Sequence, residues 1–284
     1  MIERVGFIGL GFIGEPMARQ LCEPFELCVF DLRPETVQLL VEAGAKPAAS
    51  AREVAERSQV VGVCVLDDAG VESVVAGEDG ILAGAAPGTV VAVHSTLHPD
   101  TVKRLAERAR ESQVSIIDAQ MTGGPAGAAA GTLRFMLGGE EAAVELARPY
   151  LQAMGSEITH CGAHGSGAVA KLCNNLVQYG LWQTFVDAQR LAEGTGLELE
   201  KLHEVLGWIM NDNARAMLAG RAALERDPEN EFLLGRFSET LLLAEKDLSL
   251  ALDVARRAGV SMPQTALCNQ LLARLFAVPD PKRS

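Results

Sequence analysis

The sequence predicts an α/β protein in which a doubly wound, mostly parallel sheet is followed by an all-helical second half. Short apolar stretches alternate with amphipathic segments such as 34–43 and 100–111 along the first 160 residues, which is typical of such a sheet. A glycine-rich turn follows the first of these stretches at once. From about residue 165 the strand pattern gives way to helical periodicity that continues to Phe276. We therefore expect one domain over residues 1–163 and an all-helical domain over 164–284.

The strands are expected where apolar runs have strand length. The run Val90–Val93 is apolar throughout, as expected for a strand that is covered on both faces. The full set of expected strands lies near residues 5–9, 27–30, 60–66, 89–93, 114–118 and 133–137.

Composition limits the classes of function. The 284 residues are 48% hydrophobic, which is ample for a buried core, and the formal net charge is −12. No basic run exceeds Lys282-Arg283, so nucleic acid is not an expected partner, because phosphate binding needs clustered Lys and Arg. The run Val60–Leu66 is far too short to span a bilayer, and the first strand begins too early to leave room for a signal peptide. We expect a cytoplasmic protein with no membrane segment.

The first expected strand leads into Gly9-Leu10-Gly11-Phe12-Ile13-Gly14, and a helix follows. Glycines at this spacing let a pyrophosphate approach the backbone and let the helix pack on the strand, so Gly9, Gly11 and Gly14, with Phe12 and Ile13 between them, are expected to bind a dinucleotide. The next strand ends in Asp31, 22 residues after Gly9, where a carboxylate suits the ribose diol of NAD. Nearby Arg33 weakens the expected preference for NAD over NADP. The first domain is thus predicted to be a Rossmann-like NAD-binding domain.

Cysteine and histidine spacing gives no support for a metal site. There is no CxxC pair, no HExxH and no mixed Cys-His ligand spacing. Most of the cysteines have apolar neighbours in the sequence and are expected to be small buried residues. They are Cys22, Cys28, Cys64, Cys161, Cys173 and Cys268.

A long helix is expected from about Ala168 to Glu193, after the flexible Gly162–Gly167 segment and closed by Gly194. Lys171 and Asn175 are four residues apart and share a face of this helix, which Gln178 continues. A polar stripe is usually only the solvated side of a helix. This helix, however, directly follows the expected cofactor domain, which favours a position of its polar stripe at the crevice where doubly wound sheets bind ligands.

Two further motifs follow expected strands. Thr122-Gly123-Gly124 offers a hydroxyl and two unhindered backbone N–H groups, which suit a carboxylate, although an ordinary Gly-Gly-Pro turn explains it equally well. His94-Ser95-Thr96 ends the strand before it, so its hydroxyls either lie where a dinucleotide crosses the sheet or cap a helix that starts near Pro99.

Together these motifs resemble the β-hydroxyacid dehydrogenase family, whose members include 3-hydroxyisobutyrate dehydrogenase and tartronate semialdehyde reductase. The resemblance covers almost the whole chain and rests on Gly9–Met17, His94–Thr96, Asp118–Leu133, Gly165–Asn175 and Lys246–Leu248.

The resemblance implies a role for each matching residue. Lys171 is implied as the catalytic lysine, and Asn175 as the residue that positions the substrate. Thr122, Gly123 and Gly124 are implied to bind the substrate carboxylate, Thr96 and Lys246 to contact the cofactor, and Leu66 and Asp67 to line the nicotinamide side. The implied reaction is NAD-dependent hydride transfer that interconverts a short 3-hydroxy acid and its semialdehyde, with the lysine handling the hydroxyl proton.

Two positions depart from the family pattern, and other functions stay open. Family members commonly have Pro-Val-Ser in place of Gln120-Met121-Thr122, and a proline in place of Asp67. The larger, flexible Met121 leaves the substrate undefined. An imine or other carbonyl reductase, a 6-phosphogluconate-type enzyme and a non-catalytic NAD-binding protein are the alternatives. The apolar helical half, including Leu241–Leu243, suggests a homodimer or homotetramer.

Overall fold

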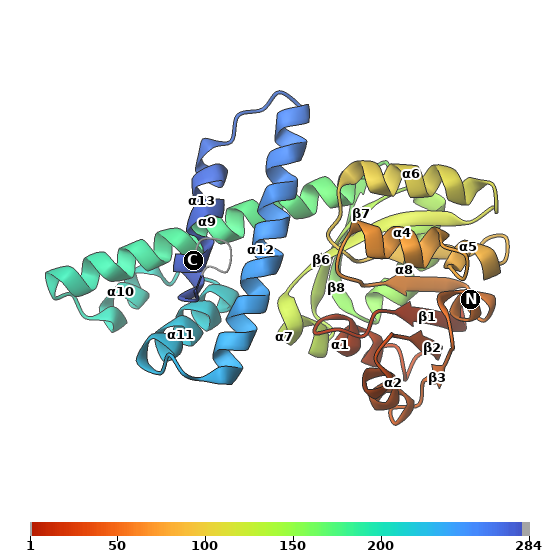
Figure 1. Ribbon diagram of the computed structural model, residues 1–284, viewed down its shortest axis with the longest axis horizontal. Coiled ribbons are helices and arrows are strands. Elements are labelled where there is room, and N and C mark those ends of the chain that lie inside the picture. Colours follow the sequence, from red (N-terminus) through yellow and green to blue (C-terminus); the bar gives the residue numbers. More distant parts are fainter. Residues whose placement is uncertain (1, 280–284) are drawn as a thin grey trace. The chain divides into compact units, whose positions relative to one another are not determined.

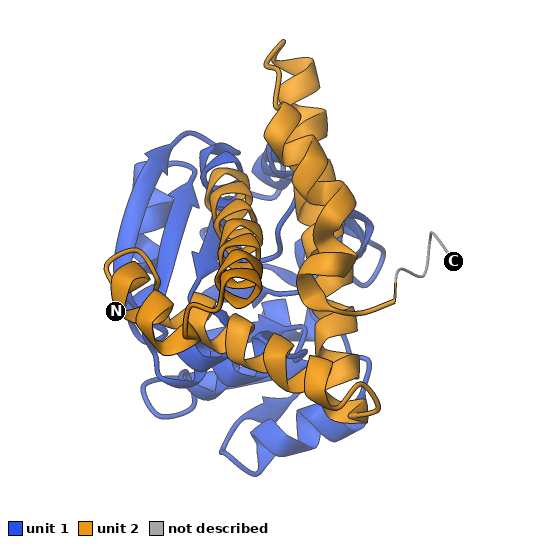
Figure 2. Cartoon of the chain, turned by 90° about the vertical axis from the view of Figure 1, so that its left-hand side faces the viewer, with its two compact units in different colours: residues 1–171 blue, residues 172–284 orange. Residues whose placement is uncertain are grey.

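The computed structural model describes residues 2–279, which fall into two compact units. Figure 2 shows them in different colours: one ends at Lys171 and the other begins at Leu172. This division lies a few residues further along the chain than the expected domain boundary at 163/164. It falls inside a continuous helix, because α9 (Ser166–Thr195) begins in the first unit and continues in the second.

The first unit is built on one eight-stranded sheet with the order β3-β2-β1-β4-β5-β6-β7-β8. Neighbouring strands are parallel except for β6 and β7, which are antiparallel. The strand numbers increase outward from the neighbouring strands β1 and β4 toward both edges of the sheet, so the strand order reverses between these two strands. In open α/β sheets, ligands bind at such a reversal. The strands are β1 (Arg4–Ile8), β2 (Glu26–Phe30), β3 (Lys46–Pro47), β4 (Val60–Val63), β5 (Val90–Val93), β6 (Ser115–Thr122), β7 (Leu133–Gly138) and β8 (Gly155–Gly162).

Helices cover both faces of this sheet (Figure 1), which confirms the doubly wound prediction. On one face α1, α2, α7 and α8 contribute to a core with the side chains of Phe7 and Phe135. On the other face α3, α4, α5 and α6 pack over Ile8 and over four valines of β4 and β5, which are Val61, Val63, Val91 and Val93. These helices are α1 (Gly14–Arg19), α2 (Pro34–Val41), α3 (Ala51–Glu56), α4 (Asp68–Ala76), α5 (Ile81–Gly84), α6 (Pro99–Arg110), α7 (Gly124–Ala129) and α8 (Glu141–Gln152).

Two strand predictions need correction, and two further strands were not predicted. β4 ends at Val63, not at Leu66, so the segment after it forms a loop at the edge of the sheet. β6 continues to Thr122 because it pairs with β7 along its second half. β3 and β8 were not predicted, because β3 has two residues and most of β8 is exposed or half-buried, which leaves no apolar run to detect.

The second unit is entirely helical. Its core joins Tyr179, Trp182 and Phe185 of α9 to apolar residues of α11, α12 and α13. α12 and α13 pack side by side (Figure 1). Besides α9 the helices are α10 (Leu199–Leu206), α11 (Asp212–Arg226), α12 (Glu231–Arg257) and α13 (Pro263–Phe276).

The ends of α9 and the cysteines also differ from expectation. α9 begins at Ser166 and runs through Gly194 to Thr195, so Gly196, with a φ of +75°, follows its end in place of Gly194. The cysteines are not uniformly buried: Cys161 and Cys173 are exposed. Among residues 2–279 no helix is long and apolar enough to cross a membrane.

Candidate active site

The glycine turn after β1 uses its three glycines in three different ways. Gly9 has φ +92°, and a Cβ there would lie 2.3 Å from the Cys64 carbonyl oxygen. A Cβ on Gly14 would lie 1.9 Å from the Gly9 oxygen, so α1 can begin this close to the turn only with glycine. Gly11 differs, because its φ is not positive and the nearest atom to an added Cβ, the Arg33 Nη2, is 3.8 Å away. Gly9 and Gly14 are required by the fold, whereas nothing in the described chain requires Gly11.

The open space at Gly11 fits a dinucleotide. A glycine without a steric neighbour is expected where a ligand approaches the backbone, as a pyrophosphate does in glycine turns of this kind. Phe12 and Leu66 follow β1 and β4, whose parallel pairing places both loops at the same edge of the sheet. Their side chains are 55% and 70% exposed, which leaves large apolar surfaces for flat rings to contact. Ile13 instead packs against the core beside α1.

Asp31 closes the same turn from the end of β2. Its Oδ2 accepts a hydrogen bond from the Leu10 N–H at 2.6 Å, and its Oδ1 accepts from the backbone N–H and Nε of Arg33 at 2.9 and 3.2 Å. Burial opposes ionisation of Asp31, but the hydrogen bonds from Arg33 and Leu10 outweigh it and lower the pKa of this carboxyl. Arg33 Nη2 also donates to the Leu10 carbonyl at 3.2 Å. Asp31 is therefore a fixed carboxylate beside the glycine turn.

The loops after β4 and β5 are joined to each other and to β6. The Val65 N–H donates to Ser95 Oγ at 2.9 Å, and the buried Gln120 amide donates to the carbonyl oxygens of Val93 and Ser95. Thr96 follows directly and is half-buried. Asp67 caps α4, because its Oδ1 accepts from the Gly70 N–H at 2.8 Å.

His94 is fully enclosed below these loops. Its Nδ1 donates to the Ala119 carbonyl at 2.8 Å, because a carbonyl oxygen can only accept, and its Nε2 then accepts from the Tyr150 hydroxyl at 3.1 Å. Burial lowers the pKa of His94 to about 4, so the imidazole is neutral near pH 7. Among the alternatives for His94-Ser95-Thr96, a helix cap is wrong: His98 caps α6.

Thr122, Gly123 and Gly124 form the end of β6 and the sharp turn into α7. Gly123 and Gly124 have φ of +129° and +63°, which are left-handed backbone conformations that favour glycine. An added Cβ on Gly124 would have no neighbour within 4 Å, whereas one on Gly123 would lie 3.1 Å from Leu133. The turn therefore exposes its backbone on the side of Gly124, as the predicted carboxylate site requires.

Lys171 lies beside this turn. Its Nζ donates to the Met121 carbonyl at 2.7 Å, and its side chain is half-buried. The predicted catalytic lysine and the predicted carboxylate turn are thus neighbours within the first unit. A lysine ammonium held next to a small anion site can polarise a carbonyl group or exchange a proton with a hydroxyl.

Asn175 and Lys246 belong to the second unit, where they share one partner. The Asn175 amide is 3% exposed and donates to Asp247 Oδ2 at 2.7 Å. Lys246 Nζ lies 3.6 Å from Asp247 Oδ1. Asp247 therefore connects two predicted site residues, although the sequence motif Lys246–Leu248 gave it no role of its own. Its position next to Lys246 is the feature of the sequence that could have indicated this role.

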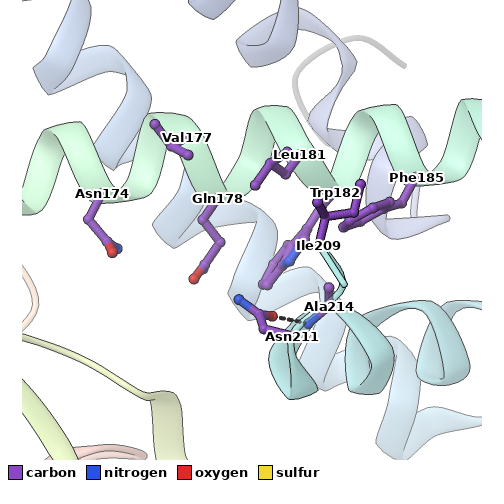
Figure 3. A pocket seen from close by; sticks show the side chains of 9 residues that line it. All are labelled: Asn174, Val177, Gln178, Leu181, Trp182, Phe185, Ile209, Asn211 and Ala214. Carbon is purple, nitrogen blue, oxygen red and sulfur yellow. Dashed lines mark hydrogen bonds between the residues drawn. The ribbon is translucent and has the colours of Figure 1, made fainter. Parts of the chain in front are cut away.

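Gln178, which continues the polar stripe of α9, lines a small pocket in the second unit (Figure 3). The pocket combines amide side chains with apolar ones and contains no charged residue. Asn211 caps α11 there by accepting from the Ala214 N–H at 2.9 Å. The lining residues are Asn174, Val177, Gln178, Leu181, Trp182, Phe185, Ile209, Asn211 and Ala214.

Two family models together match nearly the whole chain. Residues 4–162 match the NAD binding domain of 6-phosphogluconate dehydrogenase, and residues 165–281 match the NAD-binding domain of NADP-dependent 3-hydroxyisobutyrate dehydrogenase. Both matches agree with a nucleotide-binding sheet followed by a helical region.

Relatives and solved structures agree with these two matches. An NAD-dependent L-serine dehydrogenase from Pseudomonas aeruginosa is 38% identical over 97% of this chain and 93% of its own length. A 3-hydroxyisobutyrate dehydrogenase from the same species is 36% identical over 95% and 91%. The structure of Mycobacterium tuberculosis 3-hydroxyisobutyrate dehydrogenase with L-serine superimposes with a TM-score of 0.82 at 29% identity, covering 98% of this chain and 94% of that one. These matches confirm the resemblance: the chain belongs to the β-hydroxyacid dehydrogenase family of NAD-binding oxidoreductases.

Proposed function

We propose that this protein is an NAD-dependent oxidoreductase that interconverts a short 3-hydroxy acid and its semialdehyde, with Lys171 as the proton-transfer group. The observation that carries the proposal is the 2.7 Å hydrogen bond from Lys171 Nζ to the Met121 carbonyl, directly before Thr122-Gly123-Gly124. A substrate carboxylate bound by this turn has its reacting carbon only two bonds away, within reach of the ammonium group. The named relatives act on hydroxy acids of this size.

Lys171 handles the proton of the substrate hydroxyl. A bound nicotinamide supplies the hydride acceptor for oxidation and the hydride donor for reduction. In oxidation, Lys171 takes the hydroxyl proton while the carbon–hydrogen bond breaks. In reduction, its ammonium group donates the hydrogen bond that polarises the aldehyde and then gives up the proton. The Met121 carbonyl keeps Nζ oriented throughout.

The fixed carboxylate of Asp31 favours NAD. It is ionised and held by Leu10 and Arg33, so the 2′-phosphate of NADP would meet a negative charge at the ribose position. The ion pair with Arg33, whose Nε is 3.2 Å from the carboxylate, reduces this penalty. Leu66, Asp67 and Thr96 complete the cofactor edge of the sheet in this proposal.

In the helical half we propose substrate positioning by Asn175, cofactor contact by Lys246 and assembly as a homodimer or homotetramer. Asn175 follows Lys171 by about one turn of α9, and the carboxylate of Asp247 fixes its amide orientation. Assembly is supported by exposed apolar side chains, which an interface between copies of the chain would cover: Val205, Trp208 and Phe232 are 68%, 84% and 74% exposed. Light scattering that gives the mass of a monomer at micromolar concentration would contradict it.

The direct test is the absorbance of reduced nicotinamide with purified protein. The panel contains 3-hydroxyisobutyrate and L-serine, which differ only in a methyl or amino group at C2, together with a cyclic imine and 6-phosphogluconate. We expect turnover with at least one 3-hydroxy acid and NAD, and a loss of about 10²- to 10⁴-fold in Lys171→Ala. Lys171→Arg is expected to be nearly as inactive, because guanidinium does not release its proton near neutral pH. Turnover of the imine alone, or NAD binding without turnover of any compound, would refute the proposal.

A further inference from the structure

Asp118 is a buried carboxylate for which the reaction described above has no use. It lies in the middle of β6, is completely buried, and belongs to the same strand as Met121. Its Oδ1 accepts from the Gly165 N–H at 3.1 Å and its Oδ2 from the Ala168 N–H at 2.9 Å. Both oxygens are therefore directed at the start of α9.

The surrounding backbone leaves room for these contacts only because of two glycines. A Cβ on Gly138 would lie 2.4 Å from Asp118 Oδ1, and a Cβ on Gly167 would lie 2.5 Å from the Met136 carbonyl. The first turn of α9 thus lies directly against β6 and β7. Burial raises the pKa of Asp118, while the two backbone hydrogen bonds favour its charged form.

We infer that Asp118 is a positioning residue for Lys171. The strand holds the helix at two places: Asp118 binds the N–H of Ala168, and one turn later Met121 binds the ammonium group of Lys171. A carboxylate at a helix N-terminus satisfies donors that have no partner within the helix and stabilises the first turn. Without it, the turn that carries Lys171 loses its attachment to Asp118 and keeps the one to Met121. This inference rests on the proposed function only where it concerns turnover.

The test is Asp118→Asn, which keeps the size of the side chain but turns one acceptor into a donor that faces an N–H. We expect turnover to fall about ten- to a hundredfold, as small misplacements of a reacting group do, with the NAD dissociation constant changed less than about twofold. The matched control is Ser50→Ala, which removes the side-chain cap of α3 in the same unit and is expected to leave turnover unchanged.

A double-mutant cycle separates positioning from a general loss of structure. If Asp118 acts through Lys171, adding Asp118→Asn to Lys171→Ala changes the residual turnover less than about twofold. An equal loss in both backgrounds would overturn the inference.

Amine labelling followed by mass spectrometry tests the same point without assuming that Lys171 is catalytic. We expect Lys171 to be labelled several times faster in Asp118→Asn than in the parent, whereas Lys46 on β3, which pairs with Glu26, keeps its rate. An unchanged rate at Lys171 would overturn the inference, and full turnover of Lys171→Ala would overturn only the proposed function. If Asp118→Asn does not fold, Asp118→Ser, which shortens the side chain but keeps an acceptor oxygen, takes its place in both experiments.

Discussion

Gly11→Ala is expected to weaken NAD binding while leaving the fold as stable as the parent or more stable. The added methyl group has no protein atom closer than the Arg33 Nη2 at 3.8 Å, and the φ of Gly11 suits any L-residue. Gly-to-Ala changes at such positions stabilise proteins by about 0.4–1 kcal/mol, because the unfolded chain loses freedom. The same methyl group occupies the space assigned to the pyrophosphate. A forced contact of this kind costs about 1–3 kcal/mol, which corresponds to a dissociation constant about 5 to 150 times larger.

Calorimetric titration with NAD and thermal unfolding of the same samples measure both effects. Gly235→Ala on α12 is the matched control, since its methyl group also meets no atom within 4 Å but lies in the helical unit. It should raise the melting temperature and leave NAD affinity unchanged. Gly14→Ala, whose methyl group would lie 1.9 Å from the Gly9 oxygen, should instead destabilise the protein. If Gly11→Ala binds NAD within about twofold of the parent, the open space at Gly11 is not the pyrophosphate site.

Three further outcomes are expected. Asp31→Ser should lower the ratio of kcat/KM with NAD to kcat/KM with NADP. A parent enzyme that uses NADP as well as NAD would refute the assignment of Asp31 to the ribose. Thr122→Ala should raise KM for the hydroxy acid about ten- to a hundredfold, since a hydrogen bond to a charged group contributes about 1.5–3 kcal/mol, while the NAD dissociation constant stays unchanged. Because His94 is buried in its neutral form, the free energy of unfolding should decrease in acid. Because its pKa is about 4 in the folded protein and 6.5 in the reference state, protonation favours unfolding, and about 3 kcal/mol of the free energy of unfolding is lost as the pH falls from about 6.5 to about 4. Denaturant titrations at a series of pH values check this, and His94→Gln should lack that part of the slope.

The sequence was sufficient to predict those parts of the fold that depend on local pattern. The apolar runs of β1, β4 and β5 and the glycine turn are each visible within a few residues, and the structure confirms the doubly wound sheet they predict. β8 was not predicted because most of it is exposed and its sequence has no apolar run. Backbone pairing with β7, which the sequence pattern does not reveal, defines this strand.

In the candidate site too, residues defined by local spacing could be predicted, and residues defined by distant contacts could not. Asp31 could be found because the distance between a glycine turn and the next strand end is nearly constant in such folds. The role of Asp118 could not, because its partners Gly165 and Ala168 are 47 and 50 residues away in the sequence. Asp247 likewise meets Asn175 across 72 residues. Contacts of this kind depend on how elements pack, which local periodicity does not encode.

The antiparallel pairing of β7 with β6 gives the start of α9 the same direction as β6. Because β7 and β8 run opposite to β6, the chain leaves β8 at the far edge of the sheet and α9 must then travel alongside β6 in the direction of β6. Successive contacts advance together along both segments: His164 with the carbonyl of Ile116, Ala168 with Asp118, and Lys171 with Met121. One residue inserted between His164 and Ala168 would rotate everything after it by about 100° and carry the lysine away from β6. The length of a short glycine-rich connection thus matters as much to this lysine as the lysine's own identity.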